Sequence, residues 1–218
     1  MTTIINLEDQ LQAVLKEHSM LRHPFYQAWT KGTLKLEQLQ EYARQYFHFE
    51  AAFPRFLSAI HSRTESTSVR QILLENLWDE EHGKRNHRAL WLEFANALGV
   101  SRSEVEASQA NVETKELIKH FENKCTNAPV SEALATMFAY EGQIPQIAEE
   151  KITGLREMYN MQPQEYEFFT VHMESDVAHS NAEIQALKTI STDENAMVNA
   201  TNEACERLLS FLDGCYSS

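Results

Sequence analysis

The sequence predicts an all-α protein folded as a single helical bundle, and three observations support this. The chain of 218 residues contains only six glycines and five prolines, too few for a turn-rich sandwich or a glycine-looped nucleotide fold. Its hydrophobic share of 43% can fill a sizeable core. Apolar residues recur at helical spacing throughout. Without a repeat, a low-complexity tract or a long linker, residues 1–218 are expected to form one domain.

The first third of the chain predicts three helices. Proline at position 24 suits the first turn of a short second helix, and Gly32 supplies its stop. A long helix follows over residues 36–63, bent at Pro54 because the proline ring displaces a main-chain carbonyl. The opening helix is indicated by one apolar face, which consists of Ile4, Leu7, Leu11, Val14 and Leu15.

The remaining two thirds predict further long helices. Residues 69–98 form one periodic segment that Gly99 ends, and Ser101 with Glu104 matches a capping box for a short connector. Pro145 falls inside another periodic segment, where it is expected to cause a local bulge. The other helices are expected over residues 111–124, 130–159, 164–190 and 195–212.

Net charge and cysteine spacing limit the possible binding partners and the cellular location of the protein. Nineteen basic and 32 acidic side chains give a net charge of −13, which repels nucleic acid and anionic membranes. No apolar run approaches the roughly 20 residues of a membrane span, and the start of the chain lacks signal-peptide features. We therefore expect a cytoplasmic protein. The three cysteines (Cys125, Cys205 and Cys215) show no metal-binding spacing and are expected to be reduced packing residues.

Three of the predicted helices carry polar residues in the middle of an otherwise apolar stripe. In the segment 69–98, Glu80 and His87 are seven residues apart, nearly two full turns, and would share a face with Lys84. The segment 164–190 repeats the pattern. Its three polar residues within one narrow arc are His172, Asp176 and His179, and the segment 130–159 contributes Glu141.

Burying such acids without a counter-charge costs several kcal/mol each, so something positive is expected among them. Three carboxylates and three imidazoles suit two divalent metal ions, and oxygen-rich ligands without thiolates favour iron or manganese over structural zinc. Two other interpretations stay open: a buried salt-bridge network, with Lys84 beside Glu80, and a solvent-exposed polar face. Structural roles are expected for the other histidines, which are His18, His23, His48, His61, His82 and His120.

Five ordered sequence blocks resemble one protein family. They are MLRHPFYQAWTKG (20–32), AFPRFLSAIHSR (52–63), NLWDEEHGKRNH (76–87), YEGQIPQIAEEKITGL (140–155) and HMESDVAH (172–179). They resemble the chlamydial protein associating with death domains and its bacterial relatives. That family belongs to the haem-oxygenase-like di-metal oxidases, distantly related to the pyrroloquinoline-quinone biosynthesis protein C and to thiaminase II. The resemblance implies a bundle of about seven main helices with an iron–iron or iron–manganese centre.

The resemblance also implies roles for individual residues. Its metal ligands fall on Glu80, His87, Glu141, His172, Asp176 and His179, the same six that the stripes indicate. Its activity is the formation of para-aminobenzoate, the folate precursor, with dioxygen and an external reductant. The protein's own tyrosine, here Tyr26, would supply the ring, and Lys151 the nitrogen. Tyr42 and Tyr140 match further tyrosines near the centre.

Other observations qualify this picture. Lys151 lies well off the Glu141 stripe of an ideal helix, so a bulge near Pro145 must bring it round. The oxidant requires a dry pocket, for which Phe25, Trp29, Tyr46 and Phe47 are candidate walls. Two other functions stay open: a multiple-turnover oxidase or thiaminase-like enzyme acting on a small diffusing substrate, and a non-catalytic helical interaction module. A homodimer is compatible with the sequence.

Overall fold

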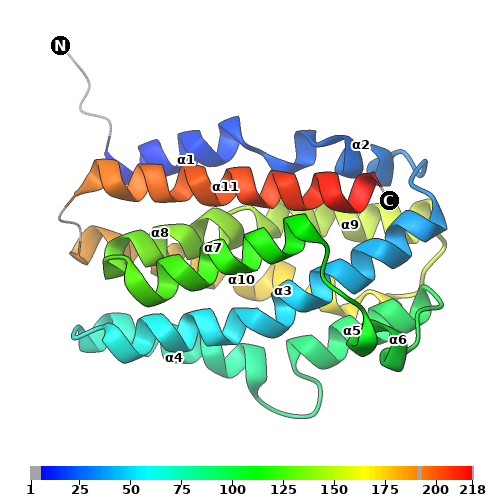
Figure 1. Cartoon of the computed structure of the whole chain (residues 1–218), viewed down its shortest axis with the longest axis horizontal. Coiled ribbons are helices and arrows are strands. Elements are labelled where there is room, and N and C mark those ends of the chain that lie inside the picture. Colours follow the sequence, from blue (N-terminus) through cyan, green and yellow to red (C-terminus); the bar gives the residue numbers. More distant parts are fainter. Residues whose placement is uncertain (1–5, 191–192, 218) are drawn as a thin grey trace.

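Residues 6–190 and 193–217 are described by a computed structural model, and their regular elements are all helices. The predicted all-α class is confirmed, while Ile4 of the predicted opening helix lies outside the described residues. Figure 1 shows a bundle in which most helices run roughly parallel to its long axis. One side of it holds α1 (Leu7–Glu17), η1 (Met20–Arg22), α2 (Pro24–Thr30) and α11 (Glu194–Tyr216). The opposite side holds α4 (Thr67–Glu81), α5 (His87–Ala97) and α6 (Arg102–Ala107).

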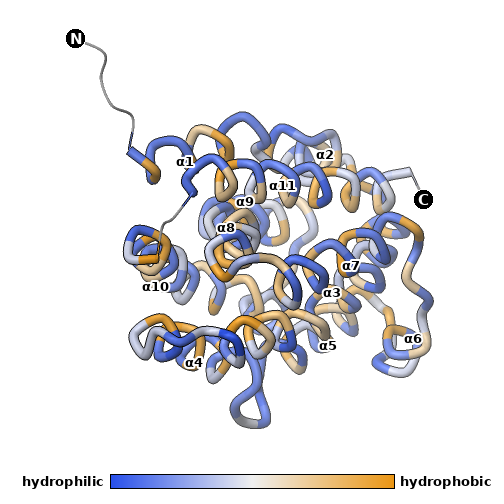
Figure 2. The backbone as a smooth tube through the Cα atoms, turned by 60° about the vertical axis from the view of Figure 1, so that its left-hand side comes forward, coloured by the Kyte–Doolittle hydropathy of each residue, from blue (hydrophilic) through white to orange (hydrophobic). Residues whose placement is uncertain are grey.

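The middle of the bundle is built around α8 (Val130–Glu141). It packs against α10 (Glu167–Ile190), α11, α7 (Val112–Asn127) and α3 (Leu36–Arg63), and Figure 2 shows it surrounded by these rods. Ten of its twelve residues are buried. Small residues such as Ala135 and Ala139 allow neighbouring helices to approach closely. The last residue of α8, Glu141, therefore ends inside the protein, with 2% of its surface exposed.

The prediction of one helix over residues 69–98 is wrong, because the chain breaks between α4 and α5. Gly83 adopts a φ of +84°, a left-handed conformation that glycine accepts readily. Asn86 then caps α5, its side-chain oxygen accepting the amide of Ala89 at 3.0 Å. Glu80 and His87 thus come from two helices and share no stripe. Lys84 lies exposed in the connecting turn, away from the buried Glu80.

The predicted helix over residues 130–159 is also two helices. The break falls at Gly142 and Gln143, and Pro145 stands near the start of α9 (Ile144–Glu157) rather than in a helix interior. Gly142 is tightly enclosed, since a Cβ there would lie 2.7 Å from Leu15 Cδ1. Because of this break, α9 does not continue the turns of α8. Lys151 therefore points in a different direction from the one that a single continuous helix would give it.

Several local expectations are confirmed. The helix over residues 36–63 has the predicted bounds, although Pro54 does not interrupt it, and Ser101 with Glu104 forms a capping box at the start of α6. All three cysteines are free and buried. Among the described helices, none has the length and apolar character needed to cross a bilayer. A short helix of three residues, η2 (Pro163–Glu165), precedes α10.

Candidate metal centre and tyrosine cavity

Acids and imidazoles from five helices meet inside the bundle. We call this set the acid–imidazole cluster. Five of the six predicted ligands are buried, and the side chain of the sixth, His179, is 11% exposed. The cluster consists of Glu50 from α3, Glu80 from α4, His87 from α5, Glu141 from α8, and His172, Asp176 and His179 from α10. A solvent-exposed polar face is therefore contradicted.

The first half of the cluster centres on two histidines. His87 Nδ1 lies 3.0 Å from Glu80 Oε2, although neither atom has a hydrogen-bond partner. The rings of His87 and His172 are 4.2 Å apart between centroids. One ligand atom from each of Glu50, His87 and His172 lies within 4.8 Å of the other two. Atoms about 3 Å apart without hydrogen-bond geometry are spaced like neighbouring ligands of one octahedral ion.

Sequence reasoning missed Glu50. Its signal was present, because Glu50 is the acid on a stripe of α3 that otherwise reads Leu39, Ala43, Tyr46, Phe53 and Leu57. The stripe test that identified Glu80 and Glu141 identifies Glu50 equally well. Its carboxylate adds a fourth acid to the three predicted.

The second half of the cluster is held by neighbours that sequence reasoning did not single out. Asn76 donates a hydrogen bond of 2.8 Å to Glu141 Oε1. His179 approaches Asp176 Oδ1 at 3.5 Å through Nδ1 and Asp79 Oδ2 at 3.1 Å through Nε2. Asn76 and Asp79 thus orient two predicted ligands, which is the usual task of residues surrounding a metal site.

The side chains present fit a pair of divalent cations. Buried atoms without a hydrogen-bond partner are normally rare, yet they gather here: Glu80 Oε2, His87 Nδ1, Glu141 Oε2, Asp176 Oδ2 and His179 Nδ1. His172 Nδ1 is engaged by the carbonyl of Phe168 at 2.8 Å, which leaves Nε2 available. No lysine or arginine of the described residues forms an ion pair with Glu80, Glu141 or Asp176. A salt-bridge network through Lys84 is therefore contradicted.

A second buried region contains Lys151 and four tyrosines, which are Tyr26, Tyr42, Tyr46 and Tyr140. We call it the tyrosine cavity. It is an interior space of about 20 Å³. Lys151 Nζ donates a 2.7 Å hydrogen bond to the hydroxyl of Tyr42 and lies 5.4 Å from the ring centroid of Tyr26. The break before α9 thus brings Lys151 to the site. Polar side chains on its wall are Tyr26, Tyr42, Tyr46, Tyr140 and Lys151; apolar ones include Met20, Ile144 and Phe211.

Aromatic packing holds the tyrosine cavity in place. The Phe25 ring contacts Tyr26 with centroids 5.3 Å apart, and Trp29 donates from Nε1 to the Lys151 carbonyl at 3.3 Å. Gly154 permits that contact, because a Cβ there would lie 2.7 Å from Trp29 Cδ1. Phe47 does not belong to this wall; its ring lies beneath the Arg88 guanidinium at 5.2 Å. That part of the predicted wall is wrong.

Hydroxyl groups connect the tyrosine cavity with the acid–imidazole cluster. Tyr26 and Tyr42 share a side-chain hydrogen bond, and the hydroxyls of Tyr46 and Tyr140 share another. Tyr46 also bonds to Glu50. Because Glu50 belongs to the cluster, the two buried regions form one continuous polar interior.

Comparisons with known proteins agree with this geometry. The sequence profile of a family described as "Iron-containing redox enzyme" matches residues 40–211. This chain belongs to that family. The matched range includes all seven residues of the acid–imidazole cluster. The family resemblance inferred from five sequence blocks is confirmed.

Two relatives of this iron-containing redox enzyme extend over almost its whole length. The 4-aminobenzoate synthase of Chlamydia muridarum is 43% identical over 96% of this chain and 89% of its own. The 4-aminobenzoate synthase of Nitrosomonas europaea is 41% identical, with 97% and 91% covered. The fold matches the crystal structure of a TenA homologue from Pseudomonas syringae, with a TM-score of 0.84, 14% identity, and 100% and 98% of the two chains covered.

The electrostatics of the cluster favour the binding of cations there. Burial raises the pKa of Glu141 to about 8, and the charge of Asp176 adds to the shift. Burial also raises the pKa of Glu80 well above its usual value, helped by Asp176 and Glu141. Burial lowers the pKa of His172 far below its usual value, so this imidazole is neutral and able to bind a metal. Acids that repel one another and neutral imidazoles form a site that a divalent cation stabilises.

Proposed function

We propose that this enzyme forms para-aminobenzoate from its own side chains, in a dioxygen-dependent reaction that consumes an external reductant. Tyr26 supplies the aromatic ring and Lys151 the amino nitrogen. Two relatives of about 40% identity are named 4-aminobenzoate synthases. The acid–imidazole cluster holds two metal ions, either two irons or one iron and one manganese.

The size of the tyrosine cavity carries this proposal. Sites for small organic molecules usually enclose about 300–1,000 Å³, whereas this interior space is about 20 Å³. A diffusing aromatic substrate finds no room beside Tyr26, but dioxygen, which is close to water in size, does. The ring at the reaction site is then the protein's own. A multiple-turnover enzyme would need a larger cavity.

Lys151 has the environment that an amino donor needs. Its side chain is buried with 4% exposure, and burial lowers the pKa of its amine to about 7. A large fraction is therefore neutral near pH 7 and carries the free electron pair that a nitrogen nucleophile requires. The hydrogen bond to Tyr42 holds the amine beside the Tyr26 ring.

The remaining residues prepare the reaction. Iron or manganese bound by the cluster supplies the oxidising chemistry when dioxygen is present. Tyr46, Tyr140 and Glu50 connect that cluster to the tyrosine cavity by hydrogen bonds, a route along which protons can move. Phe25 and Trp29 pack against the reacting ring and exclude water from it.

The deciding experiment is intact-mass measurement of the iron-loaded protein before and after exposure to reductant and oxygen. Peptide mapping should place a mass loss at Tyr26 and a change at Lys151, with no more than one equivalent of para-aminobenzoate per chain. An unchanged polypeptide with product beyond one equivalent would show a multiple-turnover enzyme instead.

Two variants provide the control. Tyr26→Phe should abolish both the mass change and the product, because a phenylalanine ring lacks the hydroxyl that marks the reacting phenol. Tyr159→Phe removes a partly buried tyrosine whose hydroxyl bonds to the Leu34 carbonyl and should behave like the wild type. A non-catalytic interaction module would yield no product in any of them.

A further inference from the structure

A second pocket opens on the surface directly outside the tyrosine cavity. It lies between α1, η1 and the α8–α9 junction and encloses about 330 Å³, within the range of small-molecule sites. We call it the basic pocket. Leu21 and Ile147 give it an apolar part. Its polar lining consists of Gln12, Lys16, Ser19, Arg22, Gln143 and Gln146.

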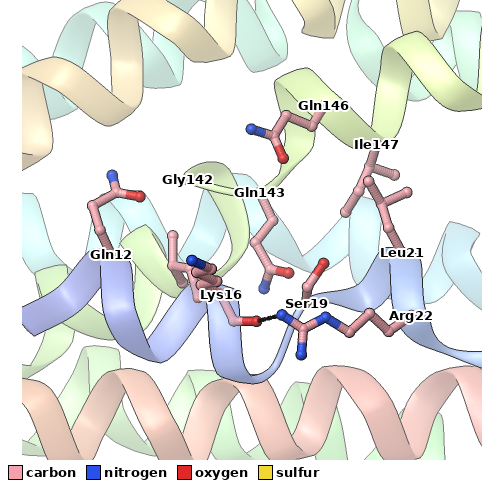
Figure 3. Close-up of a pocket in the computed structure, with 10 residues that line it drawn as sticks. Gln12, Lys16, Ser19, Leu21, Arg22, Gly142, Gln143, Gln146 and Ile147 are labelled. Atoms are coloured by element: carbon pink, nitrogen blue, oxygen red, sulfur yellow. Dashed lines mark hydrogen bonds between the residues drawn. The ribbon is translucent and has the colours of Figure 1, made fainter.

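The charge of the basic pocket is opposite to that of the protein. The chain carries a net charge of −13, yet Lys16 and Arg22 line the pocket and no acid does. Neither cation is ion-paired with an acid of the described residues. Arg22 donates to the main-chain carbonyl of Lys16 at 2.5 Å, which holds its guanidinium beside the pocket, as Figure 3 shows. Two cations that acids leave unpaired in an acidic protein favour a small anion here.

Only a thin wall separates the basic pocket from the tyrosine cavity. Met20 lines the cavity, while its neighbours Ser19 and Leu21 line the pocket. Ile144 likewise lines the cavity, and the preceding residue, Gln143, lines the pocket. Met20 and Ile144 are both buried. A methionine side chain is flexible, so this wall can open without unfolding a helix.

Gln143 holds the wall closed. Its side-chain oxygen accepts the amide of Met20 at 3.0 Å, and its side-chain nitrogen donates to the Ala139 carbonyl at 3.0 Å. In Figure 3 the Gln143 side chain points from the α8–α9 junction toward Lys16 and Ser19. Gln143 therefore contacts the pocket, the wall and the end of α8. Its partner in α8, Ala139, lies two residues before Glu141.

We propose that the basic pocket binds an aromatic carboxylate and is the route by which the product leaves the tyrosine cavity. This inference rests on the proposed function. Met20 and Ile144 form the gate, Gln143 is its latch, and Lys16 and Arg22 bind the carboxylate once the ring has passed. Leu21 and Ile147 contact the apolar ring, while Gln12 and Gln146 are placed to accept from the amine.

Binding is tested on unreacted protein, so its outcome does not depend on turnover. Para-aminobenzoate, its uncharged analogue para-aminobenzamide, and inorganic phosphate are titrated by calorimetry. We expect the carboxylate to bind at least tenfold more tightly than the amide or phosphate. Equal affinity for the amide would overturn the role of the two cations, and tighter phosphate binding would overturn the aromatic ligand.

Charge variants locate the site. Lys16→Gln combined with Arg22→Gln should weaken para-aminobenzoate binding by tenfold or more and leave the weak binding of the amide unchanged. Lys31→Gln combined with Arg55→Gln removes the same charge from exposed positions outside the pocket and should have no effect. If both double variants bind para-aminobenzoate like the wild type, the ligand binds elsewhere and the proposal fails.

The gate is tested after reaction with iron, reductant and oxygen. Ile144→Trp, or the milder Met20→Phe if the tryptophan variant does not fold, should retain through desalting a larger fraction of the product it forms than the wild type does, whatever the extent of its chain-mass loss. Release at the wild-type rate from both variants would overturn the gate. A failure of the proposed function looks different, because no chain-mass loss would then occur in any variant, including the wild type.

Discussion

The acid–imidazole cluster and the tyrosine cavity are both buried polar regions of one bundle, yet they satisfy their polar atoms differently. In the cluster, Glu80, Glu141 and Asp176 each keep a buried oxygen without a partner. In the tyrosine cavity, Lys151 bonds to Tyr42, and Tyr46 bonds to Tyr140. None of these cavity atoms is left unpartnered among the described residues.

This difference in hydrogen bonding predicts that the stability of the two regions depends on different conditions. A buried polar atom without a partner costs about 1–3 kcal/mol, and more when it is charged, so a bound cation would stabilise the cluster. In the tyrosine cavity, by contrast, the amine of Lys151 and the hydroxyls of Tyr46 and Tyr140 already have partners within the fold. Stability of the cluster should therefore depend on metal, and that of the cavity on pH.

The largest expected effect is the loss of metal-dependent stability when ligands of the cluster are substituted. Anaerobic ferrous iron at about a thousand times its dissociation constant should stabilise the wild type by about 4 kcal/mol. Asp176→Asn and His172→Ala should lose that gain and bind less metal by elemental analysis. Tyr42→Phe alters only the tyrosine cavity and should keep both the metal and the gain. Equal metal content in all three variants would show that the cluster does not bind metal.

The next largest effect is the dependence of stability on pH that the buried amine of the tyrosine cavity should produce. The pKa of Lys151 is about 7 in the folded protein against an ordinary value of 10.5, so between these values the unfolded chain binds one more proton. Stability of the metal-free wild type should then rise with pH, relative to Lys151→Met, by about 1.4 kcal/mol per unit from pH 7.5 to 9.5. Urea unfolding at several pH values measures this. Parallel pH profiles for the two proteins would contradict a buried neutral amine.

The smallest effect concerns an acid beside the cluster that the proposed function does not use. Both carboxylate oxygens of Glu183 are buried without a partner, and burial raises its pKa well above the usual value, with the charges of Glu141 and Asp176 adding to it. Glu183→Met should stabilise the metal-free protein by about 1–3 kcal/mol in urea unfolding. The exposed change Glu150→Met should stay within about 0.5 kcal/mol. Destabilisation by Glu183→Met would mean that the carboxylate has a partner in solution.

Much of the site could be predicted because buried polar residues interrupt apolar stripes. That reasoning identified Glu141, His172 and Asp176, and applied to α3 it would also have found Glu50. It paired Glu80 with His87 for a wrong reason, since the two residues belong to different helices. They meet because the turn between α4 and α5 is short and returns the chain to the same interior point. Their roles as ligands, like those of Tyr26 and Lys151, stay predictions.

The amino-acid sequence by itself determined the helical class, most helix starts and the list of chemically capable residues, because caps, apolar periodicity and residue type are local properties. The family resemblance across five blocks was likewise readable from it. Only the tertiary structure decided which of those residues meet. The breaks at Gly83 and Gly142 set the directions of His87 and Lys151, and contacts between α9, α2 and α3 place the amine beside Tyr26. Such contacts join residues about a hundred positions apart, and no local pattern encodes a distance of that kind.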